Sequence, residues 1–441
     1  MSVVQATVGR DRVLDLTKSF ALLVVVLGHA LAWDVSTGEP ASVLDLRPDL
    51  RWVTWLLQVL PLFFAAGAVS NLASWRRRGV EEDFWRRRIG RLATPAVLYA
   101  TVWTAVLLPL AAWSPTVELV GRYFAQLLWF LGVYAAIVVA VPLTARWVES
   151  PRRTLTSWLV VIIVVDLVRW KLAPSLGWVN MLLVWGWLHQ LGYSLPALRA
   201  VNRPALVSGG LVAFAAALGV AVVGPYSTSM VSIAGDPGLS NLSPPTVVLA
   251  LYGLAQVLVL AAVWPLLDMA LRWRPAWLVV AGFGSRALEV YLWHVPLVGV
   301  VAGCAWLLEL GPSPFSRPWW ALHVAAATAV VTGAWLLGGP MGRVSRRLAD
   351  WASGLPGPGL APLGPAVVVS LSILAVSQTG FATWWGPGLV GLWMTTLPIV
   401  VLLVLAWWTV QGSGGVGAHD ARRLPGGHVT DLPGRDTALA E

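Results

Sequence analysis

The segment LDLTKSFALLVVVLGHALAW (residues 14–33) is apolar enough to lie in a lipid bilayer, yet it carries Asp15, Lys18 and His29. Ionisable groups in the hydrocarbon layer cost about 2.5–3.5 kcal/mol each on insertion scales, so those that persist usually face a bundle interior or a cavity. The eleven positions from Lys18 to His29 span three helical turns plus roughly 20°, and Asp15 lies on the same side. One face of this helix therefore carries a carboxylate, an amine and an imidazole, with the last two about 16 Å apart.

The composition of the whole chain indicates a membrane protein. Of its 441 residues, 57% are hydrophobic and only 12% are charged, and the mean hydropathy is +0.73. Soluble proteins carry roughly twice that share of charge. The 28 tryptophans fit the same class, because indole rings favour the membrane interface. The single cysteine, Cys304, excludes intrachain disulfides and cysteine-based zinc sites.

Runs of about 20 apolar residues have the length needed to cross the hydrocarbon layer as helices. They predict twelve spans, at 13–33, 52–75, 92–113, 124–147, 155–172, 179–196, 205–224, 246–271, 277–305, 319–339, 365–383 and 388–410. The Pro/Gly-rich stretch 354–365 separates the last two from the first ten. We therefore predict an all-α polytopic protein with a ten-helix domain at 10–350, a linker at 351–364 and two additional helices at 365–410, followed by a disordered cytoplasmic tail at 411–441.

The distribution of basic residues predicts the orientation of the spans. With the N-terminus inside, inner segments hold 22 of the 30 lysines and arginines, and outer segments hold six. Cytoplasmic loops carry such an excess, so both termini are expected in the cytoplasm and the chain in the cytoplasmic (plasma) membrane. Topology also explains the net charge of +9 better than nucleic-acid binding does, because the arginines form no basic stripe and no recognisable nucleic-acid module.

Most of the other intramembrane ionisable residues have structural explanations. Asp166 and Asp268 are expected near span ends, within reach of headgroup water. Arg286 and Glu289, three residues apart on a helix, are expected to neutralise each other. Two further histidines, His189 and His323, lie near span ends, and we expect satisfied or interfacial side chains there.

His29 admits three interpretations. A neutral imidazole within a bundle is typical of a general base or of a proton relay, and it can also be purely structural. No second histidine or carboxylate lies three or four residues after it, so we expect no metal site.

Several short motifs resemble the acyltransferase 3 family of polytopic membrane proteins. In that family an arginine in the first helix is followed, after ten residues, by a histidine; here Lys18 precedes His29 at that spacing. An Arg-x-x-Arg near the start of the third helix is matched by Arg88 and Arg91 in FWRRRIGRLATP. Further similar stretches are LPLFFAAGAVSN (60–71), LWFLGVY (128–134), VWGWLHQLGYSL (184–195), GDPGLSNLSPPTVVLALYGLAQ (235–256) and LEVYLWHVPL (288–297). The similarity spans the first ten helices, and the stretches 184–195 and 235–256 resemble uncharacterised members from high-GC Gram-positive bacteria in particular.

The resemblance implies transfer of an acyl group, with acetyl the expected one, from cytoplasmic acyl-CoA to a hydroxyl. The acceptor would be a glycan, a lipid-linked sugar or a secreted metabolite, and no cofactor would be permanently bound. His29 would be the general base, and Lys18 would hold the thioester end of the donor or stabilise developing negative charge, with Asp15 beside it. Because lysine lacks the planar guanidinium fork, Lys18 is the main departure from the family pattern.

The remaining candidate residues surround these. Arg88 and Arg91, one helical turn apart, would bind the CoA phosphates, although orientation in the membrane alone also explains arginines in this loop. Glu289 or Asp34 would orient His29. Glu289 and His294 would line the acceptor pocket, although His294 could instead simply bond a backbone carbonyl.

Two other functions stay open at this point. A proton-coupled exporter or flippase could use Asp15, Lys18, His29, Asp166 and Glu289 as a relay, although the halves of the chain show no convincing internal repeat. An inactive scaffold with the same fold is the third possibility. The sequence predicts no oligomeric state.

Overall fold

The computed structural model of the chain describes residues 11–412 apart from 39–40, 79, 234–235, 237 and 385–394. Residues 413–441, which make up nearly all of the predicted tail, lie outside the described residues. So does the first part of the predicted twelfth span, 388–394.

The described chain is helical almost throughout, with one two-residue antiparallel strand pair between β1 (Trp33–Asp34) and β2 (Ala41–Ser42). Its α-helices are α1 (Arg12–Leu31), α2 (Val43–Leu46), α3 (Val53–Leu57), α4 (Leu60–Arg78), α5 (Glu81–Leu110), α6 (Pro115–Ala125), α7 (Leu128–Val139), α8 (Val141–Thr144), α9 (Pro151–Lys171), α10 (Asn180–Gly192), α11 (Leu195–Leu198), α12 (Arg203–Val223), α13 (Val247–Ala270), α14 (Arg274–Gly284), α15 (Ala287–Leu307), α16 (Arg317–Ser353), α17 (Leu363–Thr379) and α19 (Thr396–Gln411). Short 3₁₀ turns are η2 (Pro48–Trp52), η3 (Ala145–Glu149) and η4 (Pro174–Val179).

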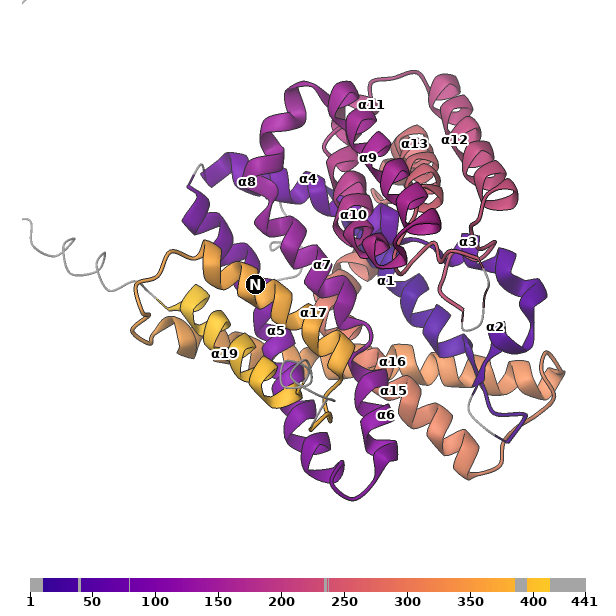
Figure 1. Cartoon of the computed structure of the whole chain (residues 1–441), viewed down its shortest axis with the longest axis vertical. Helices are drawn as coiled ribbons and strands as arrows, with labels where there is room; N and C mark the ends of the chain where they lie inside the picture. Colours follow the sequence, from indigo (N-terminus) through magenta and orange to yellow (C-terminus); the bar gives the residue numbers. More distant parts are fainter. Residues whose placement is uncertain are drawn as a thin grey trace, which may run out of the picture.

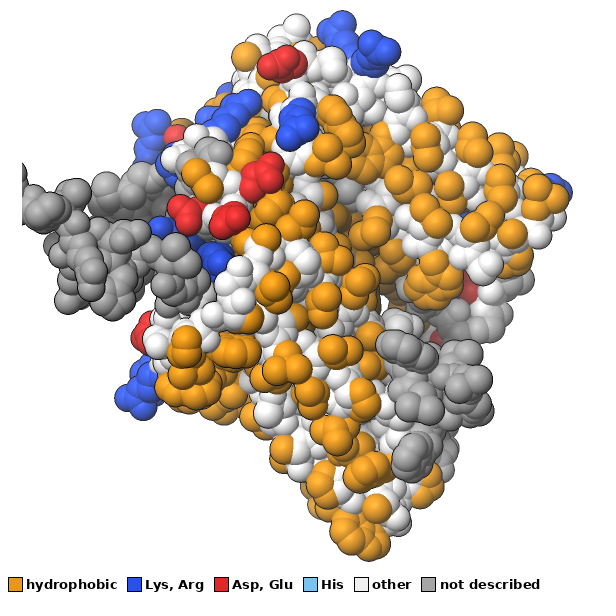
Figure 2. Space-filling view, turned by 60° about the vertical axis from the view of Figure 1, so that its left-hand side comes forward, with side chains coloured by type: hydrophobic (Ala, Val, Ile, Leu, Met, Phe, Trp, Pro, Cys, Tyr) orange, Lys and Arg blue, Asp and Glu red, His pale blue; other side chains and the backbone are white. Residues whose placement is uncertain are grey.

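The outer surface of this bundle is that of a membrane protein. Within the described residues, eight helical segments are long and apolar enough to cross a bilayer, and α17 and α19 are shorter apolar helices. Many large apolar side chains point outward; Val212 and Val223 on α12, for example, are 69% and 89% exposed. Figure 2 shows the resulting broad hydrophobic surface, on which most of the charged side chains gather toward the upper left. Such a surface is stable only against lipid.

Several predicted spans are interrupted rather than continuous. The predicted span 277–305 consists of α14 and α15, separated at Ser285 and Arg286. Gly282, Gly284 and Ser285 are poor helix formers, and Arg286 leaves the helical conformation as its guanidinium stacks on Trp335 and donates to the Trp335 carbonyl. The spans predicted at 52–75 and 124–147 are also broken, before α4 and on both sides of α7. Non-helical backbone at membrane depth is tolerated where it is buried in protein or lines a cavity.

Helix α1 lies in the interior of the bundle, in contact with α4, α14, α15 and α16. On one side α4 packs against α10 at very short range: a Cβ on Gly192 would collide with the Ala65 carbonyl oxygen, so only glycine fits there. Helices α12 and α13 pack together beyond α10, and α17 and α19 cover α7 and α5 on the opposite side (Figure 1). The first helix is thus enclosed by α4, which follows it early in the chain, and by α14, α15 and α16, which come much later.

The prediction that Asp166 reaches headgroup water is wrong. Its side chain is buried, and it accepts hydrogen bonds from Asn180 Nδ2 at 2.9 Å and from the Val247 backbone N–H at 2.8 Å. Arg169, also buried, lies 3.5 Å from it and donates to the carbonyls of Pro244 and Ser240. This ion pair fastens the loop between α12 and α13 onto α9. Asp268 does lie at the surface, where it pairs with Arg272.

We expect Arg169→Ala to destabilise the fold by about 3–5 kcal/mol, because it leaves the Asp166 carboxylate buried without its charged partner. Arg272→Ala, which breaks a solvent-exposed pair, should cost less than about 1 kcal/mol. Thermal unfolding of both variants in detergent measures the difference. Equal losses would show that the Asp166–Arg169 pair does not anchor the loop.

Candidate active site

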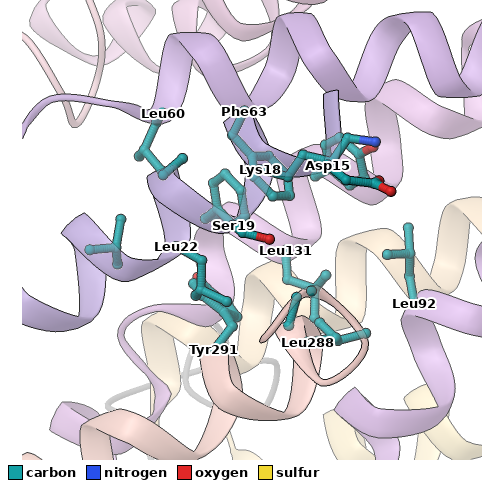
Figure 3. A pocket seen from close by; sticks show the side chains of 16 residues that line it. Asp15, Lys18, Ser19, Leu22, Leu60, Phe63, Leu92, Leu131, Leu288 and Tyr291 are labelled. Carbon is teal, nitrogen blue, oxygen red and sulfur yellow. The ribbon is translucent and has the colours of Figure 1, made fainter. Parts of the chain in front are cut away.

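A cavity of about 190 Å³, partly open to the outside, lies alongside α1. Helices α4, α5, α7, α14 and α15 provide the rest of its wall. Asp15 and Lys18 lie together at one end, and Leu22 and Tyr291 lie further along (Figure 3). The break between α14 and α15 forms part of the wall through Gly284, Ala287 and Leu288. The cavity is mostly apolar, and its charged side chains are confined to one end.

Lys18 and Arg88 meet at Ser70 of α4. Lys18 Nζ donates to Ser70 Oγ at 2.6 Å, and Arg88 Nη2 donates to the Ser70 carbonyl. The Ser70 hydroxyl in turn donates to the Ala66 carbonyl at 3.3 Å, which fixes its orientation. Two cations from α1 and α5 are therefore held beside one residue at the Lys18 end of the cavity.

A buried polar cluster lies next to these cations. Asn71 Nδ2 donates to Tyr134 Oη at 3.2 Å and lies 3.1 Å from His189 Nε2. Tyr134 also lines the cavity, and Arg88 is near enough to Tyr134 and His189 to interact with both electrostatically. His189 is buried and satisfied, as expected, but it belongs to the surroundings of the charged end of the cavity.

His29 lies against His294 of α15. His29 Nδ1 is 2.8 Å from the Val25 carbonyl oxygen and 3.4 Å from His294 Nε2, and the ring centroids are 5.3 Å apart. His294 Nδ1 is 2.7 Å from the Tyr291 carbonyl oxygen, so in the neutral ring Nδ1 carries the proton and Nε2 is an acceptor. The same reasoning places the proton of neutral His29 on Nδ1. His29 Nε2 is then the unprotonated, basic nitrogen.

The histidine pair lies just beyond the cavity. Val25 and Tyr291 line the cavity, and each is one helical turn before a histidine of the pair. The Tyr291 hydroxyl donates to the Leu127 carbonyl, which holds this ring across the end of the space. Lys18 therefore lies at one end of the cavity and His29 lies just beyond the other end, as their spacing on a single helix requires.

Neither of the two residues proposed to orient His29, Glu289 of α15 and Asp34 of β1, contacts it. Asp34 is buried and accepts hydrogen bonds from the Ser36 hydroxyl and from Trp319 Nε1 at 2.8 Å. Glu289 faces α16: a Cβ on Gly342 would lie 3.2 Å from Glu289 Oε1. Neither side chain reaches His29, because each is held on the side of α16; His294 is the side chain that contacts it.

Three further expectations need correction or refinement. Arg286 and Glu289 form no ion pair among the described residues. Arg286 stacks on Trp335 and donates to its carbonyl, and Glu289 interacts electrostatically with Arg346. Neither Glu289 nor His294 is among the residues that line the cavity. Arg88 and Arg91 also differ in burial: Arg88 is half-buried at Ser70, whereas Arg91 is exposed.

Sequence reasoning missed Ser70, Asn71 and Tyr134 as neighbours of Lys18. A signal was present, because Ser70 and Asn71 end the stretch LPLFFAAGAVSN, Tyr134 ends LWFLGVY and His189 lies in VWGWLHQLGYSL. These stretches are far apart along the chain, and the structure brings them to one end of the cavity. Across the described residues, no group of three or more potential metal ligands occurs.

The comparisons with known proteins agree with this architecture. The family model of the acyltransferase 3 domain, described as an acyltransferase domain, matches residues 11–339. Searches of curated proteins and of solved structures found no significant match. The matched region runs from α1 into α16, and so it includes the cavity, the cations at Ser70 and the histidine pair. Because the match covers 329 of the 441 residues, the chain belongs to the acyltransferase 3 family of membrane acyltransferases.

Proposed function

We propose that the protein transfers an acyl group, with acetyl the expected one, from cytoplasmic acyl-CoA to a hydroxyl of a glycan, a lipid-linked sugar or a secreted metabolite. One observation carries the proposal: an apolar cavity within the family-matched bundle has two cations at one end and a histidine pair just beyond the other. This arrangement suits an elongated donor with an anionic head and a reactive thioester tip.

The proposed topology has twelve spans with both termini in the cytoplasm. Its orientation is supported by the arginines of α5 and by those near the end of α16, which extend a helix of 37 residues. At 1.5 Å per residue, α16 is about 55 Å long and exceeds the hydrocarbon thickness of about 30 Å. The Arg-rich ends would then lie in the cytoplasm, on the side from which acyl-CoA arrives.

The donor would enter at the Lys18 end. Guanidinium groups bind phosphate through paired charge-assisted hydrogen bonds, so Arg88 and the exposed Arg91 are suited to the CoA phosphates. The apolar walls would exclude water along the acyl arm, and Lys18 would stabilise negative charge near the donor. Asp15, next to Lys18 in the cavity wall, would limit the net positive charge there (Figure 3).

His29 would act as the general base. Its Nε2 takes the proton of the acceptor hydroxyl while the oxygen attacks the thioester carbonyl carbon. The tetrahedral intermediate then collapses, the carbon–sulfur bond breaks, and the proton passes from His29 to the leaving CoA thiolate. His294 would assist by accepting from His29 Nδ1–H, which fixes the tautomer and stabilises the imidazolium.

A proton-coupled exporter or flippase is the alternative, and the geometry gives it less support. Its relay would need Asp166 and Glu289 in line with Lys18 and His29. Asp166 instead fastens the loop between α12 and α13, and Glu289 faces α16.

We expect His29→Ala to lower the hydrolysis of acetyl-CoA, with water as acceptor, by about 10²–10⁴-fold, because the base is lost. Binding of CoA should stay within about twofold, since His29 lies beyond the donor-binding end. Radiolabelled acetyl-CoA and purified protein in detergent measure both quantities.

His294→Asn, which retains a hydrogen-bond acceptor, should keep more hydrolytic activity than His294→Phe. Unchanged turnover in His29→Ala would exclude a base role for His29.

Arg88→Ala should weaken CoA binding by about tenfold or more, because a charge-assisted phosphate contact is lost. Arg87→Ala is the matched control: Arg87 is exposed, carries the same charge and lies on another face of α5. Its Kd should change by less than about twofold. Isothermal titration with CoA compares the variants, and equal effects would mean that the arginines act only through orientation in the membrane.

A further inference from the structure

The two helices that follow the family-matched region pack on the proposed donor-binding helix. The match ends at residue 339, within α16, whereas α17 and α19 come later in the chain. Helix α19 lies along α5, and α17 lies between α19 and α7 (Figure 1). The final helix of the described chain therefore contacts the helix that carries Arg88 and Arg91.

The contact centres on Thr94, one turn beyond Arg91. Trp407 Nε1 donates to Thr94 Oγ1 at 2.8 Å, and Gln411 Nε2 donates to the same oxygen at 3.0 Å. Thr94 Oγ1 in turn donates to the Gly90 carbonyl at 2.8 Å. Thr94 and Trp407 are both buried, so these hydrogen bonds are protected from water.

Gly90 lies between Arg88 and Arg91 and makes room for Gln411. A Cβ at Gly90 would be 2.9 Å from Gln411 Nε2 and 3.1 Å from its Oε1. The Gln411 side chain therefore rests directly on the helical turn from which both arginines extend. A Cβ at position 90 would displace the Gln411 side chain from this turn.

Arg86 of α5 also contacts the C-terminal end of α19. Arg86 Nη1 donates to the Gly412 carbonyl at 2.8 Å and to the Val410 carbonyl at 3.3 Å. These carbonyls lie at the C-terminal end of α19, where a cation satisfies otherwise unpaired acceptors and interacts favourably with the helix dipole. Contacts from both helices thus set the distance between α5 and α19 at the arginine turn.

We propose that α19 is a positioning element of the donor site, and that Gln411 holds the Arg88–Arg91 turn in the register needed to bind acyl-CoA. The inference rests on the proposed function, since it assumes that Arg88 contacts the donor. On this account the family-matched region does not form a complete donor site by itself. Gln411 is a positioning residue: it acts through Gly90 and Thr94 and needs no contact with the donor.

The experiment measures the Kd for CoA and the kcat and KM for acetyl-CoA hydrolysis in the full-length protein. Gln411→Leu removes the amide at similar volume. Gly90→Ala acts from the opposite side and improves the intrinsic helix propensity of α5, so a folding defect is not its expected effect. We expect each to raise Kd and KM by about three- to tenfold and to change kcat by less than about twofold.

Two reference variants make the outcome decisive. Leu403→Val thins the buried packing of α19 two turns away from Gln411, so it should lower the melting temperature without changing Kd. Arg88→Ala should raise Kd. If Arg88→Ala raises Kd and the Gln411 and Gly90 variants do not, the positioning role is wrong while the donor site stands. If Leu403→Val raises Kd equally, α19 acts only through general stability. If Arg88→Ala leaves Kd unchanged, the donor site and the inference both fail.

Discussion

The structure depends on one constraint: a carboxylate, an amine and an imidazole share one face of a helix that lies in a membrane. None of the three can face lipid at low cost, so α1 must be enclosed by other helices. The bundle provides this enclosure with α4, α14, α15 and α16 around it. All three then have protein surroundings: Asp15 lines the cavity, Lys18 bonds Ser70, and His29 contacts Val25 and His294. The cavity beside α1 follows from the same arrangement.

Two departures from regular helices lie beside this cavity. The break between α14 and α15 brings Gly284 and Ala287 to the wall, and the break before α7 is next to the segment whose carbonyl holds Tyr291. The extra length of α5 extends its arginines beyond the membrane-spanning part of the helix. The site thus combines an apolar cavity with a cationic end, and acyl transfer from a charged, elongated donor would require both.

Much of the fold could be predicted from the sequence because hydrophobic run length and charge asymmetry are local signals. The α-helical membrane class and the positions of α1, α9, α12 and α13 follow from them directly. The interruptions could not be placed, since Gly284 and Ser285 break a helix only where Arg286 finds a partner on α16. The placement of Lys18 and His29 on one face of α1, about 16 Å apart, was predictable from helical period. The partnership of His29 with His294, and of Lys18 with Ser70, depends on contacts between distant segments that no single-sequence pattern encodes.

On the proposed function, the acyl arm of the donor occupies the cavity between Lys18 and His29. Leu22, buried in the cavity wall between the two, offers the most direct test. Leu22→Trp would fill the space, and Phe20→Trp on the exposed side of α1 is the matched control. The account predicts that Leu22→Trp retains CoA binding within about threefold but loses acetyl-CoA turnover by about tenfold or more, while Phe20→Trp retains both. Full turnover in Leu22→Trp would contradict it.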